Sequence, residues 1–214
     1  KIGEAEKCQR VRSLVDQIDW DCELKTLFRD ENLGCAKAIS SAITWFFQQV
    51  EQGIILEDDC VPHPDFFPYC EEMLNYYRDN ETIKIISGDN FQDGKKRGNA
   101  SYYFSAHPNI WGWSSWRRTC EGYDLYLENY SLSEFKDALS FYFTSWNERQ
   151  MWIDKFLTMK KQGVNTWDYQ LVFKIWKEKG VCINPNVNLI SNVGFGNDAT
   201  HNFNKDSVGI GIET

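Results

Sequence analysis

The run from Gly53 to Asp59 constrains the fold of this chain more than any other stretch. Gly53-Ile54-Ile55-Leu56 is uncharged and leads directly into three consecutive carboxylates, Glu57-Asp58-Asp59. A short continuous apolar run is typical of a strand buried on both faces of an α/β sheet. Neighbouring like charges raise the free energy unless a cation binds among them, and ligands of open α/β sheets lie at the carboxyl ends of strands. We therefore expect a buried strand that ends at a site for a hard cation carrying phosphates. A solvated strand end or a helix N-cap is the alternative.

The pattern around this run alternates between helix and strand. Helices are expected over residues 6–18, 34–49, 65–78, 131–143, 147–161 and 169–179, and strands over 23–28, 53–56, 83–87, 102–104, 181–183 and 187–190. Strands that alternate with helices favour a mostly parallel sheet with crossover helices. The sequence thus predicts the α/β class, with one domain over residues 1–214.

Composition excludes several functional classes. The net charge is −8, and a pI near 5.0 argues against nucleic-acid binding, which needs a basic face. The seven Cys form no CxxC pair, so we expect no zinc knuckle but reduced thiols of a cytosolic protein. No apolar run reaches about 18 residues, so no transmembrane helix is expected, and no signal peptide is recognisable. The expected location is cytoplasmic, either free or peripheral to a membrane.

A second motif runs from Arg29 to Lys37, where a predicted strand leads through a loop to a helix that begins at Gly34. Backbone N–H groups at a helix N-terminus attract phosphate, and Arg29 and Lys37 would add positive charge. An ordinary capped helix explains the same residues. Both interpretations stay open for this motif.

A single carboxylate, Asp168, stands at a predicted helix start between Trp167 and Tyr169. Aromatic walls desolvate a carboxylate and raise its pKa towards that of a useful general base. An N-cap aspartate is the alternative, and the local sequence by itself favours that alternative.

Two further candidates involve aromatic residues and a histidine. Trp111-Gly112-Trp113 would form a stacking platform for a sugar acceptor, or else belong to the core. His201 follows a Gly-rich, Asp-containing loop and becomes a candidate metal ligand only if the end of the chain folds back over the carboxylates.

The order of these pieces resembles GT-A-fold glycosyltransferases, in particular N-acetylglucosaminyltransferase I and bacterial nucleotide-diphospho-sugar transferases. The resemblance covers about residues 23–203. It rests on Ile55-Leu56-Glu57-Asp58-Asp59, Asn109-Ile110-Trp111-Gly112-Trp113, Thr166-Trp167-Asp168, and Ile183-Asn184-Pro185-Asn186 continuing through Gly194-Phe195-Gly196 to His201.

The resemblance implies a role for each acidic residue. Asp59 would bind Mn²⁺ or Mg²⁺, which would bridge the diphosphate of a nucleotide-diphospho-sugar, expected to be a UDP-sugar. Asp58 would contact the ribose or the donor sugar, and Glu57 would order the turn. Asp168 would be the general base, although in the eukaryotic enzyme two acids follow the Trp, so the assignment could shift by one position. His201 would reach the metal or the diphosphate.

The expected function is metal-dependent transfer of a sugar from a nucleotide-diphospho-sugar to a hydroxyl acceptor such as a glycan, with inversion at the anomeric carbon. Residues 1–90 would handle donor and metal, and residues 91–214 the acceptor. One departure from the family is that nothing before Glu6 can form its first nucleotide-binding strand, of which Lys1-Ile2-Gly3 would be the trailing edge. The alternatives are a truncated or degenerate GT-A module that binds a glycan or a partner, and a nucleotidyltransferase, whose Gly-rich phosphate loop is not seen.

Overall fold

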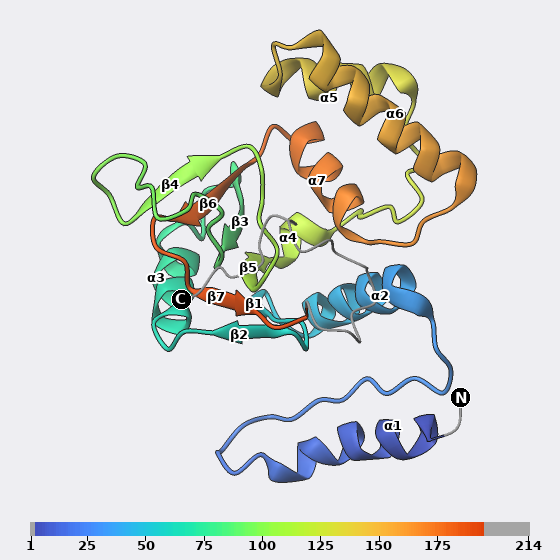
Figure 1. Cartoon of the computed structure of the whole chain (residues 1–214), viewed down its shortest axis with the longest axis vertical. Helices are drawn as coiled ribbons and strands as arrows, with labels where there is room; N and C mark the ends of the chain where they lie inside the picture. The colour runs from blue at the N-terminus through green and yellow to red at the C-terminus, as the bar shows by residue number, and fades with distance from the viewer. Residues whose placement is uncertain (1–2, 195–214) are drawn as a thin grey trace. The chain divides into compact units, whose positions relative to one another are not determined.

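A mixed five-stranded sheet organises the larger part of the computed structural model, which describes residues 3–194 (Figure 1). Its strand order is β1 (Gln52–Ile55), β5 (Trp113–Trp116), β3 (Ile83–Ser87), β6 (Val181–Pro185) and β4 (Tyr102–Ser105). Only β3 and β6 pair in parallel, and the other neighbouring strands are antiparallel. The α/β class is confirmed, but the prediction of a mostly parallel sheet is wrong.

The error comes from β5, a strand that the sequence pattern did not reveal. Trp-Ser-Ser-Trp lacks the continuous apolar character that marked β1 and β3, yet all four of its residues are buried. β5 lies antiparallel between β1 and β3, and Trp113 pairs with both Ile55 and Ser87. β1 and β3 therefore run in the same direction, and their carboxyl ends meet the turn before β5 at one edge of the sheet.

A two-stranded sheet begins directly after the turn that follows β1. β2 (Cys60–Pro62) pairs antiparallel with β7 (Ile190–Asn192), which begins three residues later than the predicted strand at 187–190. The N–H of Val193 donates to the carbonyl of Asp59 at 2.8 Å. β1 has only β5 as a neighbour and is half-buried along its length, so the prediction that it is fully buried is wrong.

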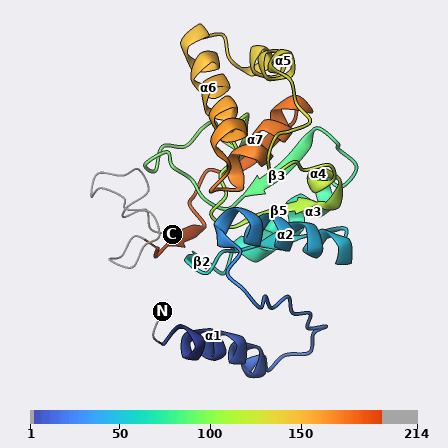
Figure 2. The same cartoon turned by 90° about the vertical axis from the view of Figure 1, so that its right-hand side faces the viewer.

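Helices cover both faces of the five-stranded sheet (Figures 1 and 2). α2 (Gly34–Gln49) and α7 (Asp168–Lys177) contribute to the cluster that contains Ile85, whereas α3 (Phe66–Tyr76) contributes to the cluster that contains Ile86. Successive strand residues point to opposite faces, so this alternation separates the two clusters. The bounds of α2 agree with the prediction.

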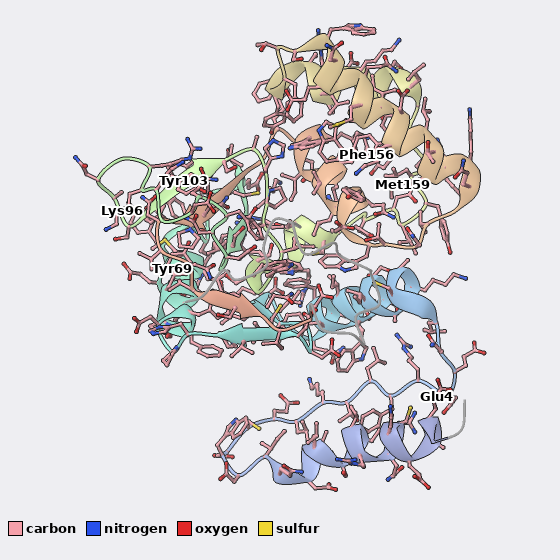
Figure 3. All side chains as sticks on the ribbon, in the orientation of Figure 1. Glu4, Tyr69, Lys96, Tyr103, Phe156 and Met159 are labelled. Carbon is pink, nitrogen blue, oxygen red and sulfur yellow. The ribbon has the colours of Figure 1, made fainter. Side chains whose placement is uncertain are left out.

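A pair of helices, α5 (Leu132–Tyr142) and α6 (Trp146–Gln162), packs on α7 on the side away from the sheet (Figures 1 and 2). Their N-termini are set by capping serines at 131 and 145, which accept hydrogen bonds from backbone N–H groups three residues later. Phe156 and Met159 lie on the side of α6 that faces α7 (Figure 3). The short α4 (Arg117–Cys120) follows β5 directly.

The chain divides into two units, Lys1–Gly34 and Cys35–Thr214, and each is described by itself. In the first unit, α1 (Glu4–Arg12) and the 3₁₀ helix η1 (Ser13–Gln17) contain no buried residue. The predicted strand at 23–28 does not form, and the backbone there is irregular. The prediction of one domain, with its halves at 1–90 and 91–214, stays a prediction. No helix within residues 3–194 combines the length and apolar character needed to cross a membrane.

Candidate active site at the carboxyl end of β1

The three consecutive carboxylates lie in the turn that joins β1 to β2. The N–H of Cys60 donates to the Glu57 carbonyl at 3.1 Å, which closes this turn. Glu57 and Asp59 are half-buried, whereas Asp58 is exposed. The backbone thus fixes the position of the carboxylates, while at least one side chain remains open to solvent.

Glu57 is affected by the charge of a residue distant in sequence, Asp168. Burial, and then the negative charges of Asp59, Asp58 and Asp168 in that order, together raise the pKa of Glu57 to about 7. Asp168 therefore lies close enough to the turn for its charge to act on Glu57. The structure brings together the two carboxylate segments that the sequence analysis had singled out separately.

The position of Asp168 is fixed by its neighbours at the start of α7. Trp167 is buried and stacks on Trp113, with ring centroids 6.0 Å apart and an interplanar angle of 21°. The Tyr123 hydroxyl donates to the Trp167 carbonyl at 2.6 Å, and the Thr166 hydroxyl donates to Asp168 Oδ1. Asp168 makes no N-cap hydrogen bond, since Trp167 occupies the N-cap position and caps nothing through its side chain. The capping alternative for Asp168 is therefore wrong.

One residue of this site was missed by the sequence analysis. Cys35, in the first turn of α2, has its pKa raised by burial and then by the charges of Glu57 and Asp168. The N-terminus of α2 therefore faces the same carboxylates. The free N–H groups of a helix N-terminus favour an anion such as a diphosphate. The position of Cys35 immediately after the predicted helix start was the only signal for it in the sequence.

The two basic residues that were predicted to bind the donor belong to different units of the chain. Lys37 lies on α2 two residues after Cys35, is exposed, and forms no ion pair within the described residues. Arg29 belongs to the first unit, where its carbonyl accepts a hydrogen bond from the Arg12 guanidinium. The predicted roles of Lys37 and Arg29 stay predictions.

The four carboxylates are the candidates to hold a divalent cation, which would have to take part of its coordination from a ligand. Within residues 3–194 no ion pair joins Glu57, Asp58, Asp59 or Asp168 to a basic side chain, so no cation of the described residues pairs with their charge. No three His, Cys, Asp or Glu side chains in that part of the chain are arranged to hold a metal unaided. Mg²⁺ and similar cations commonly bind through one or two carboxylates together with water and substrate phosphates.

The two tryptophans of the predicted acceptor platform have different environments. Trp113 is completely buried in the core against Trp167, so the prediction that it stacks on an acceptor is wrong. Trp111 is only partly buried and packs edge-on against Phe91, with centroids 4.8 Å apart. Trp111 remains a candidate, whereas His201 lies outside the described residues.

A second residue that the sequence did not single out is Asp89, two residues after β3. It is 1% exposed, and within residues 3–194 neither carboxyl oxygen has a hydrogen-bond donor in good geometry. Burial holds its pKa well above the ordinary value of 3.8, although the backbone N–H groups of Asp89 and Trp111 lower it somewhat. Burial without a counter-charge therefore favours the protonated, neutral form of Asp89 in the folded chain.

The isosteric substitution Asp89→Asn is expected to stabilise the fold at neutral pH. Because the folded pKa is raised, the folded state keeps a proton that the unfolded state releases above pH 3.8, so stability falls as pH rises from there. The amide has no such proton to lose. We expect a gain in the free energy of unfolding of about 1–3 kcal/mol at pH 7 that vanishes near pH 3.5, measured by urea denaturation. The exposed Asp79→Asn is the control, and a gain that does not change with pH would contradict the assignment.

No protein-family model matches the chain, and no curated protein matches it at a significant level.

Proposed function

We propose that this chain belongs to a metal-dependent glycosyltransferase that moves a sugar from a nucleotide-diphospho-sugar to a hydroxyl acceptor. The observation that carries the proposal is that the negative charge of Asp168 acts on Glu57, in the same turn as Asp59. Such a transfer needs a carboxylate that binds a metal and a separate carboxylate that acts as base. Asp59 and Asp168 would supply these two groups in one site. The resemblance of the four sequence segments to GT-A enzymes supports the same reaction.

In this proposal Asp59 holds the cation, and Asp58, the exposed member of the turn, contacts the ribose or donor sugar. When bound, a divalent cation neutralises the charge that develops on the leaving diphosphate. The N-terminus of α2, beside Cys35, offers N–H groups to the same phosphates. A UDP-sugar is the donor that the resemblance favours, and Mn²⁺ or Mg²⁺ is the cation.

Asp168 takes the proton from the attacking acceptor hydroxyl. The hydroxyl of Thr166 occupies Oδ1, so the other oxygen, Oδ2, is the one that remains for the acceptor. A correctly positioned general base contributes typically about 10²–10⁴-fold to the rate. Since Asp168 is the one candidate base, and no second candidate nucleophile was identified among the described residues, direct attack with inversion is the expected course.

A donor-hydrolysis screen tests the proposal. Nucleotide-sugars are incubated with the chain with and without Mn²⁺, and release of the nucleoside diphosphate is measured. We expect release from at least one donor that depends on Mn²⁺, and, with an acceptor present, an NMR spectrum of a product of inverted configuration. Retained configuration would contradict the single-base mechanism. Binding of glycans without release from any donor would support the alternative of a noncatalytic GT-A module.

A further inference from the structure

A groove between α5 and α6 has the composition of a binding site, although no part of the proposed reaction uses it. It encloses about 340 Å³. Its lining residues are Lys136, Asp137 and Ser140 from α5, and Trp146, Arg149, Gln150 and Ile153 from α6. The α6 residues follow the spacing i, i+3, i+4 and i+7, so they share one face of that helix. Ile153 is buried and belongs to the core cluster beneath, so it forms the floor.

The indole ring of Trp146 forms an apolar wall that the protein leaves uncovered. Trp146 is 67% exposed, and it is the only tryptophan of the described residues 35–194 with such exposure. The buried tryptophans of that unit pack in the core, so core packing does not explain Trp146. An exposed aromatic face beside polar side chains suits a ligand that has both an apolar and a hydroxylated surface, as a sugar ring does.

The charged side chains that line the groove favour a negatively charged ligand. Lys136 and Arg149 form no ion pair within the described residues, and Asp137 supplies the only negative charge among the lining residues. This local positive charge stands out because the whole chain carries −8. Arg binds carboxylates through two parallel hydrogen bonds, a geometry that Lys cannot offer.

We infer that the groove between α5 and α6 binds an anionic saccharide, with a sugar ring on Trp146 and its carboxylate on Arg149. Lys136 adds charge from the facing helix. The donor site lies on the far side of α7, at the carboxyl end of β1, so this groove would hold a charged glycan independently of the transfer reaction. The inference does not require the proposed function.

The test compares two ligands with the same sugar chain, one with free carboxylates and one in which the carboxylates are esterified and uncharged. An oligogalacturonate trimer and its methyl ester are titrated into the chain by calorimetry, and saturation-transfer NMR reports which ring protons contact the protein. We expect the acid to bind and the ester to bind at least about tenfold more weakly. Trp146→Ala and Arg149→Gln are each expected to weaken binding of the acid about tenfold. Because Trp146 and Arg149 are not core residues, both variants should fold, and circular dichroism checks this.

Matched controls localise the effect. Tyr76→Ala removes an aromatic side chain that is 75% exposed on α3, and Lys161→Gln removes a positive charge at the other end of α6. Both controls should keep the wild-type affinity. Equal affinity for acid and ester, unchanged affinity in Trp146→Ala and Arg149→Gln, or no binding up to about 10 mM ligand would each overturn the inference.

The same measurements separate this inference from the proposed function. Asp168→Asn should bind the trimer like the wild type, because Asp168 does not line the groove. Trimer binding without donor hydrolysis would refute only the transferase, and hydrolysis without trimer binding would refute only the groove. An acidic peptide that binds as tightly as the trimer and responds to the same variants would also overturn the assignment to a saccharide.

Discussion

Asp59→Asn is expected to abolish Mn²⁺-dependent binding of the nucleotide-sugar donor. The substitution keeps the size of the side chain but removes the negative charge that the cation would bind. Since the described residues provide no three-ligand metal site, the loss of one carboxylate leaves too few protein ligands to hold the cation with the diphosphate. We expect donor affinity measured by calorimetry in the presence of Mn²⁺ to fall at least about 100-fold, to the level of the metal-free wild type.

Cys35 provides an internal reporter for the same prediction. A cation bound among the carboxylates offsets the charges of Glu57 and Asp168 that raise the Cys35 pKa. The thiolate fraction should therefore rise, and Mn²⁺ should speed alkylation of Cys35 in the wild type but not in Asp59→Asn. Cys8 and Cys22, which are exposed in the first unit, should be unaffected when the modified peptides are quantified by mass spectrometry. Unchanged Mn²⁺-dependent donor affinity in Asp59→Asn, with Asp79→Asn as the control, would exclude Asp59 as the metal ligand.

Asp168→Asn is expected to slow sugar transfer by about 10²–10⁴-fold while leaving donor affinity nearly unchanged. The amide can accept the hydrogen bond from Thr166 but cannot take a proton from the acceptor. The loss should therefore appear in kcat and not in the dissociation constant of the donor. The rate is measured on the donor and acceptor pair that the hydrolysis screen identifies.

A second readout distinguishes loss of the base from a general disturbance of the site. Asp168 is one of the charges that raise the pKa of Glu57 to about 7, so Asp168→Asn should lower that pKa, which NMR titration of the carboxyl carbon can follow. Thr166→Val is the companion variant. It removes the hydrogen bond to the base without removing the carboxylate, so most of the activity should remain. Full activity in Asp168→Asn would move the role of base to another residue.

Local sequence predicted most elements, because their patterns are short-range. The bounds of α2 and β3 were predicted as observed, since a one-sided apolar stripe and a continuous apolar run each identify an element without reference to the rest of the chain. The same reasoning failed for β5. Its two serines look polar, but they are buried because neighbouring strands cover both edges and helices cover both faces.

The candidate site divides in the same way. The acidic turn after β1 was evident from the sequence, because three adjacent carboxylates after an apolar run are unusual in any context. The assignment of Asp168 could not be made locally, where the sequence favoured an N-cap. Only the folded chain, in which the charge of Asp168 acts on Glu57, separates the two interpretations. Trp113 shows the opposite case, since a motif that suggested a ligand platform lies in the core.

By itself, then, the sequence determined the α/β class, the extent of most helices and the carboxylates available for a cation, because these depend on neighbours along the chain. The tertiary structure alone decided the antiparallel place of β5, the meeting of Asp168 and Cys35 with the acidic turn, and the burial of Asp89. Each of these depends on which distant segments pack together, and a pKa or a buried surface is set by all the groups around it in space.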